Sequence, residues 1–184
     1  MNLNFKLNRI FVLFFLFFFV FSLIGCEEKE TENEVLVNEE LGFSIEFPVN
    51  WTSRLNVSKE GYTYEAISYG PTKAGYQTKM YLIRDGRFND GFDEYVNVLR
   101  NYIIENLDND SSLIDEGDYF RNNSYYFLSE SKENEILVNT KKAIFMDGDV
   151  GYALIFSINS DFFNESKSDF KNVFESITFL EEEN

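Results

Sequence analysis

The sequence predicts an α+β fold in which helices flank an antiparallel β-sheet. Between residues 35 and 179, short runs alternate apolar and polar residues, which is the pattern of strands that bury one face. Two longer segments repeat their apolar residues at helical spacing instead. Strands and helices do not alternate regularly, so the pattern favours an antiparallel sheet over a parallel one.

The first expected element is a short hairpin. Residues 35–37 and 43–47 flank a turn at Leu41-Gly42. Phe43, Ile45 and Phe47 alternate with polar residues, so the second strand has one apolar face to bury.

Further strands are expected at residues 62–69, 77–84, 113–120, 125–130, 135–145 and 150–158. Asp147-Gly148 supplies a tight turn between the last two of these. Residues 176–179 alternate like a final short strand.

Two helices interrupt the strands. Residues 89–107 form the first, with Asn89 or Asp90 as its N-cap. The second begins near Ser160, whose hydroxyl can accept hydrogen bonds from the first free amides, and runs to about Glu175. Its apolar residues lie broadly on one side: Phe163, Phe170, Val173 and Phe174.

Length and charge limit the classes of function. A chain of 184 residues favours one domain. The 32 acidic and 16 basic residues give a formal charge of -16, which excludes nucleic acid as a partner because its phosphates would be repelled. The sequence has no histidine, so the commonest general base and the commonest metal ligand are both missing.

The N-terminus has the order of a secretory signal. Lys6 and Arg9 precede an almost unbroken apolar run at residues 10–24. As a helix this run would span roughly 22 Å, which is less than the roughly 30 Å of a bilayer's hydrocarbon core. A signal peptide at residues 1–25 is therefore expected, with an uncleaved anchor as the alternative.

The residues that follow the run, Leu23-Ile24-Gly25-Cys26, resemble the lipobox of prokaryotic lipoproteins. The resemblance implies that the signal peptidase recognises Leu23, Ile24 and Gly25, and that the Cys26 thiol receives a diacylglyceryl group. Membrane lipid is then a partner through the Cys26 anchor, because two acyl chains suffice for lasting attachment. We expect the protein on the extracytoplasmic face of the cell membrane, or in the outer membrane of a host that has one.

The mature chain divides into three parts: an acidic tether at residues 26–34, a domain at residues 35–179 and an acidic tail at residues 180–184. Residues 27–34 carry no apolar side chain, so this segment should stay solvated. Loss of residues 1–25 removes Lys6 and Arg9, which changes the formal charge from -16 to -18. Cys26 is the only cysteine, so packing and not a disulfide must stabilise the domain.

The hairpin and the C-terminal end together resemble the PsbP-like family of Mog/PsbP-like α/β/α sandwiches. Residues 42–51 read Gly-Phe-Ser-Ile-Glu-Phe-Pro-Val-Asn-Trp, and residues 174–179 read Phe-Glu-Ser-Ile-Thr-Phe. The family includes an extrinsic photosystem subunit, a nuclear Ran-release factor and many prokaryotic lipoproteins. The resemblance implies an antiparallel sheet sandwiched by helices, and a role in binding or assembly without a shared active site.

Four residues of the first motif are expected to be structural: Phe43, Phe47, Pro48 and Trp51. Pro48 ends the strand without needing an amide donor. Trp51 then has a large ring to bury, and we expect it in the core beside the hairpin.

Four other motifs invite a chemical interpretation, and a structural one is favoured for each. Residues 108–112 begin like a calcium loop, but Leu113 and Tyr119 stand where glycine and a bidentate glutamate are needed. Residues 147–149 are explained by a hairpin turn. Residues 129–132 spell Ser-x-x-Lys inside a charged strand end or turn. Lys141-Lys142 is the only adjacent basic pair, and one pair is not a basic patch.

The sequence thus predicts a lipid-anchored binding or assembly module without catalytic residues, metal or cofactor, whose partner is an unidentified membrane or envelope protein. Two alternatives stay open. A carboxylate-dependent hydrolase of envelope polymers predicts two carboxylates in a ligand-sized cleft with their pKa values pushed apart. A passive surface or adhesion component predicts neither such a cleft nor a specific partner.

Overall fold

A computed structural model describes residues 33–59, 62–121 and 123–180. The apolar run and Cys26 lie outside these residues. The elements in chain order are β1 (Glu34–Asn38), β2 (Phe43–Phe47), β3 (Thr52–Lys59), β4 (Tyr62–Lys73), β5 (Tyr76–Arg87), α2 (Phe92–Glu105), β6 (Ser111–Asp118), β7 (Ser124–Glu133), β8 (Ile136–Asp147), β9 (Val150–Asn159), a 3-10 turn η1 (Ser160–Phe162), α3 (Lys167–Ser176) and β10 (Thr178–Phe179).

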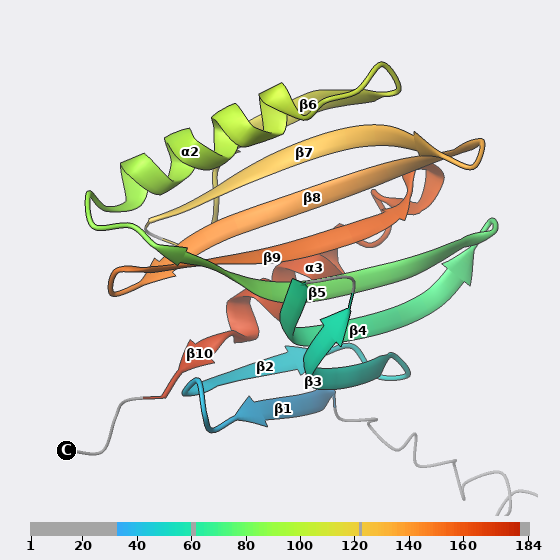
Figure 1. Cartoon of the computed structure of the whole chain (residues 1–184). Helices are drawn as coiled ribbons and strands as arrows, with labels where there is room; N and C mark the ends of the chain where they lie inside the picture. Colours follow the sequence, from blue (N-terminus) through green and yellow to red (C-terminus); the bar gives the residue numbers. More distant parts are fainter. Residues whose placement is uncertain (1–32, 60–61, 122, 181–184) are drawn as a thin grey trace, which may run out of the picture. The chain divides into compact units, whose positions relative to one another are not determined.

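The strands form two antiparallel sheets (Figure 1). The larger sheet has the order β3-β4-β5-β9-β8-β7-β6, and the smaller has the order β1-β2-β10. Most neighbours are joined by hairpins, but β5 pairs with β9 from Lys79 opposite Ser157 to Arg87 opposite Val150. This non-local pairing places β5 and β9 side by side at the centre of the sheet. Antiparallel sheets combined with helices confirm the predicted α+β class.

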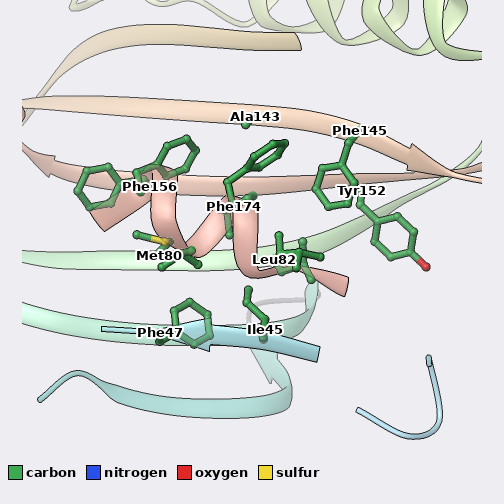
Figure 2. Close-up of a cluster of buried hydrophobic side chains, with 14 of the residues drawn as sticks. Ile45, Phe47, Met80, Leu82, Ala143, Phe145, Tyr152, Phe156 and Phe174 are labelled. Carbon is green, nitrogen blue, oxygen red and sulfur yellow. The ribbon is translucent and has the colours of Figure 1, made fainter. Parts of the chain in front are cut away.

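One face of the large sheet is covered by α3 and the small sheet (Figure 2). Phe43, Ile45 and Phe47 of β2 are fully buried here, as the alternation of the hairpin predicted. From α3, Phe170, Val173 and Phe174 enter the same core, where the Phe174 ring meets that of Phe145 edge-on at 5.4 Å. The small sheet and α3 therefore share one layer.

The opposite face of the large sheet is covered by α2. Tyr95 and Leu99 of the helix are buried against Ile144 of β8 and against Ala153 and Ile155 of β9. Because helix and sheet layers cover both of its faces, β9 is buried along nearly its whole length, which explains its continuous apolar sequence.

The predicted strands are present, and several are longer than expected. β4 continues to Lys73 through an irregularity between Tyr69 and Thr72, where Pro71 needs no ladder donor. β3 was not predicted. It carries Arg54, Asn56 and Ser58 between its apolar residues, and Asn56 has a φ of 50°, so its apolar signal is short and interrupted.

Both predicted helix caps are wrong. The residue that precedes α2 is Gly91, whose φ of 90° suits glycine, and Asp90 instead donates its backbone amide to the Glu94 carboxylate at 3.2 Å. The expected second helix is split into η1 and α3, and Asn159, not Ser160, accepts from the Asp161 amide at 3.0 Å. The Ser160 hydroxyl bonds to Glu130 and Asn139 of neighbouring strands, so it is not available as a cap.

Candidate functional site

The long helix α2 leaves part of the large sheet uncovered. It packs over the β8 and β9 side, and a groove of about 440 Å³ remains between the helix and the strands on the β5 side. Side chains of β4, β5, α2, β8 and β9 line this groove, together with Phe88: Tyr64, Tyr81, Ile83, Asp85, Phe88, Val98, Leu99, Tyr102, Lys142 and Ile155. We call it the α2 groove. Its volume lies within the roughly 300–1,000 Å³ typical of small-molecule sites.

An ion pair lies in the wall of the α2 groove. The Lys142 ammonium on β8 is 3.5 Å from Oδ2 of Asp85 on β5, and the two side chains are only 17% and 16% exposed. Tyr95 of α2 donates its hydroxyl to the same Asp85 oxygen at 2.6 Å. Through Asp85, the Lys142 ion pair and the Tyr95 hydrogen bond together connect β8, β5 and α2 in the wall of the groove.

Burial shifts the pKa of both donors to Asp85. It lowers the pKa of Lys142 below the usual lysine value, and the Asp85 carboxylate opposes this shift only in part. The pKa of Tyr95 is raised, first by burial and then by the neighbouring Asp85 charge. Tyr95 therefore keeps its proton at neutral pH, whereas burial disfavours the charged form of Lys142.

Glycine in β9 makes room for the helix. A Cβ at Gly151 would lie 2.8 Å from the rings of both Phe88 and Tyr95. These rings pack on each other with centroids 4.3 Å apart. The absence of a side chain at Gly151 thus sets how closely α2 and its Tyr95 hydroxyl approach the sheet.

A second hollow of about 300 Å³ adjoins the α2 groove along β4 and β5. The two share Tyr64 and Tyr81, whose rings meet edge-on at 5.0 Å. Tyr69, Tyr76 and Lys79 line the second hollow. Aromatic side chains with polar tips therefore extend along this face of the sheet.

The mouth of the α2 groove exposes apolar surface. Val98 and Tyr102 lie one helical turn apart on α2, are 47% and 58% exposed, and both line the groove. Because they face outward from the core while Tyr95 and Leu99 face inward, they are not needed to hold the helix on the sheet. Exposed apolar groups at the rim of a hollow are typical of a binding surface.

Of the described residues singled out from the sequence, Lys142 lines this groove, and the four motif residues at the hairpin do not. Leu23, Ile24, Gly25 and Cys26 lie outside the described residues. Phe43 and Phe47 are buried in the core on the other face of the sheet.

The last two motif residues follow β2. The Pro48 carbonyl accepts from the Trp51 amide at 3.2 Å, and Trp51 is half-buried against that same core. Its indole ring covers Gly70 of β4, where a Cβ would come within 2.5 Å of the ring. Trp51 thus packs at the margin of the core.

Two acidic motifs have structural roles. In the loop after α2, Asp108 Oδ1 accepts from the Asp110 amide and the Ser111 hydroxyl, as expected of a turn. Gly148 and Asp149 form the turn between β8 and β9. Across the described residues, no three His, Cys, Asp or Glu side chains cluster as metal ligands would.

Adjacent Lys141 and Lys142 point to opposite faces of the sheet. Lys141 lies over the rings of Tyr119 and Tyr126, with its ammonium 4.3 Å from each ring centroid, and faces Phe170 of α3 at 5.6 Å. Burial, then repulsion from Lys167, lowers the pKa of Lys141 to about 8. As a single basic pair, Lys141-Lys142 does not form a basic patch, and its sequence did not predict these two separate environments.

A signal for Asp85 and Lys142 is present in the sequence. Asp85 continues the alternate positions of Tyr81 and Ile83, and Lys142 occupies the alternate position before Ile144. A charge in a series that faces a helix must be paired or lie at a site. Pairing the two residues requires the β5-β9-β8 order, which a pattern in one sequence does not contain.

The sequence matches no known protein-family profile, and no curated protein is similar to it in sequence. Its structure, in contrast, is similar to solved structures of the Mog1/PsbP-like fold. The chain therefore has this α+β fold, which confirms the fold that the two sequence motifs implied.

Three solved structures illustrate the similarity. Cyanobacterial PsbP (CyanoP) from Synechocystis sp. PCC 6803 has a TM-score of 0.53 and 11% identity over 86% of this chain and 99% of its own. The Saccharomyces cerevisiae Ran-binding protein Mog1p has a TM-score of 0.52 and 6% identity over 83% and 97%. LpqN of Mycobacterium tuberculosis has a TM-score of 0.51 and 12% identity over 82% and 91%.

Proposed function

We propose that this protein is an extracytoplasmic binding module, anchored to the membrane by lipid on Cys26, and that the α2 groove is its binding site. The observation that carries the proposal is the groove itself, which combines aromatic walls, exposed Val98 and Tyr102 at the rim and a part-buried ion pair. Such a combination of an apolar hollow with few polar groups is the usual form of a ligand site.

The ion pair supports a binding role more than a structural one. A buried pair often contributes little net stability, because the cost of removing both charges from water offsets their attraction. Packing of Tyr95 and Leu99 already holds α2 on the sheet. Asp85 and Lys142 are therefore better explained as groups that orient a ligand.

Proteins of the same fold give further support. Mog1p is described as Ran-binding, and LpqN as involved in cell envelope biogenesis. Neither description concerns catalysis. A binding role agrees with the first description, and a place at the cell envelope agrees with the second and with the lipobox-like Leu23-Ile24-Gly25-Cys26.

The hydrolase alternative finds less support. It requires two carboxylates in one cleft, but in the described part of the chain the α2 groove is lined by a single carboxylate, that of Asp85. We therefore expect no turnover of envelope glycans or peptides. If the wild type did show turnover, and an Asp85→Asn variant with an intact fold lost it, the hydrolase would be favoured over the binding module.

Photocrosslinking in the producing cell tests the site. A benzophenone amino acid replaces Tyr102 at the groove rim, and the matched control replaces Leu137 of β8, which is 51% exposed and lies outside the groove lining. We expect specific adducts, identified by mass spectrometry, from position 102 and not from position 137. Equal adducts at both positions, or none at 102, would contradict the assignment of the site.

A further inference from the structure

The Lys142 ammonium has more hydrogen-bond donors than partners. An ammonium offers three donors. Within the described residues its contact is Asp85 Oδ2 at 3.5 Å, a loose distance for a charge-assisted hydrogen bond. That same oxygen already accepts the much shorter bond from Tyr95. The ammonium is therefore the member of the cluster with the most incompletely used hydrogen-bonding capacity: three donors share one loose contact to Asp85.

The shifted pKa of Lys142 agrees with this geometry. Burial lowers the pKa more than Asp85 raises it, so the charged form is incompletely compensated. Asp85, in contrast, has both Lys142 and the Tyr95 hydroxyl beside it. A ligand that brings an acceptor improves the surroundings of Lys142, whereas a cationic ligand places a second positive charge beside it.

The net negative charge of the chain does not reverse the preference of Lys142 for a ligand that brings an acceptor. The chain is strongly acidic, with a formal charge of -16, and this field disfavours anions at a distance. Salt screens exposed charges over about 8–10 Å, while a contact inside a half-closed groove is screened much less. The contact with Lys142 therefore decides which head group binds best.

We infer that the α2 groove binds a small amphipathic carboxylate, whose acidic group accepts hydrogen bonds from Lys142 and whose aromatic or aliphatic body lies between Tyr64, Tyr81 and Tyr102. The inference rests on the proposed function and names its ligand class. The neutral rings and the aliphatic Val98 and Leu99 accommodate the apolar body. A carboxylate is preferred over a neutral acceptor because charge-assisted hydrogen bonds are stronger.

Three probes with one body and different head groups test the inference: phenylpropanoate, phenylpropanol and phenylpropylamine. Each is titrated by ligand-observed NMR against the mature protein in zwitterionic lipid nanodiscs, with empty nanodiscs as the reference for lipid partitioning. We expect phenylpropanoate to bind about tenfold more tightly than phenylpropylamine. Equal affinities, or a preference for the amine, would overturn the inference.

Two variants give opposite expected changes. Lys142→Met should remove the preference for the carboxylate, because the cation is lost. Asp85→Asn should increase the affinity for phenylpropanoate, because it removes the neighbouring negative charge and releases Lys142. Lys171→Met on α3, outside the groove lining, is the matched control and should change nothing. If Lys142→Met does not fold, the inference is still tested by the relative affinities of the three probes for the wild type and by the change in affinity for phenylpropanoate in Asp85→Asn.

The two proposals fail in distinguishable ways. Groove-specific crosslinks from position 102 without a carboxylate preference would refute the ligand class and leave the binding site standing. Carboxylate binding that is insensitive to both Lys142→Met and Asp85→Asn would show that the probe binds elsewhere, which also contradicts the inference. Absence of groove-specific crosslinks would refute the proposed site itself.

Discussion

Two adjacent lysines show how the alternation of a strand gives neighbouring residues different chemistry. Lys141 faces aromatic rings of β7 and α3, whereas Lys142 faces a carboxylate beside α2. Their pKa values are lowered mainly by the same cause, burial, but their partners differ. At the scale of the residue, each partner gives a testable consequence.

Breaking the Asp85–Lys142 pair should destabilise the protein. Lys142→Met leaves the part-buried Asp85 carboxylate with Tyr95 alone, and Asp85→Asn leaves the ammonium without its counter-charge. We expect each single variant to lower the free energy of unfolding by about 3 kcal/mol, and the double variant to lose less than the sum of the two. Urea unfolding followed by the fluorescence of Trp51, the one tryptophan, measures all four proteins. Additive losses would contradict a coupled pair.

Lys141 should make stability depend on alkaline pH. Its pKa is lowered to about 8 in the folded protein, while a lysine in the unfolded chain titrates near 10.4. Between pH 8 and pH 10.4 the unfolded state binds more protons than the folded state. The cost of burying charged Lys141, which lowers the stability of the folded protein below pH 8, therefore disappears as the pH rises through this window. We expect the stability of the wild type to rise relative to Lys141→Met across this window. NMR titration of labelled lysines checks the cause, since a resonance titrating near 8 must vanish in the variant.

At the scale of the element, the close packing of α2 on the large sheet depends on Gly151. Because a Cβ there would meet the rings of Phe88 and buried Tyr95 at 2.8 Å, Gly151→Ala must displace the helix or those rings. We expect a loss of about 1–3 kcal/mol in thermal unfolding and a changed near-ultraviolet circular dichroism spectrum.

Gly117→Ala in β6 is the matched control for that substitution. The nearest atom to its added Cβ is in the Tyr126 ring at 3.5 Å, an ordinary contact. Its effect should stay within about 0.5 kcal/mol. Similar losses at both glycines would mean that strand propensity, and not the close approach of α2, sets the cost.

Elements with strong periodicity were predictable from the sequence. The β1-β2 hairpin, α2 and the apolar side of α3 follow from spacing alone, since one face of each must be buried. The cap of α2 was not predictable in the same way: Asn89 and Asp90 are good capping residues, but the chain turns through Gly91 and Glu94 bonds back to the Asp90 amide. Local propensity did not decide between neighbouring cap positions.

The candidate groove depends on information that local patterns lack. Asp85 and Lys142 become neighbours only because β9 lies between β5 and β8. That order is set by long-range packing of both sheet faces. The family motif predicted the fold correctly, and its Phe43, Phe47, Pro48 and Trp51 explain packing on the other face of the large sheet.

At the scale of the whole molecule, the two faces of the large sheet are covered unequally. α3 and the small sheet bury one face in the larger core, whereas α2 alone covers part of the other (Figure 1). The uncovered part is where the tyrosine-lined hollows lie. A fold with one well-covered face and one partly covered face combines a stable core with an accessible binding surface.

Membrane attachment would complete this arrangement. Residues 27–33 separate Cys26 from β1, which begins at Glu34, and an extended seven-residue segment spans at most roughly 25 Å. A domain confined to such a layer meets ligands of the membrane surface at raised effective concentration, so weak binding in the groove suffices. In the described residues, no helix has the length and apolar character needed to cross a bilayer.

We therefore predict that Cys26 carries the anchor. Cys26→Ala removes the only thiol to which a diacylglyceryl group can be attached, and the variant should move from the detergent phase to the aqueous phase on detergent partitioning, or retain residues 1–25 if cleavage requires the lipid. Ser22→Ala, within the apolar run, is the matched control and should stay in the detergent phase. Intact mass spectrometry of the wild type should show a mature chain that begins at a lipid-modified Cys26. An unmodified Cys26, or a mature N-terminus at another residue, would contradict the lipobox interpretation and leave the groove without its expected place at the membrane.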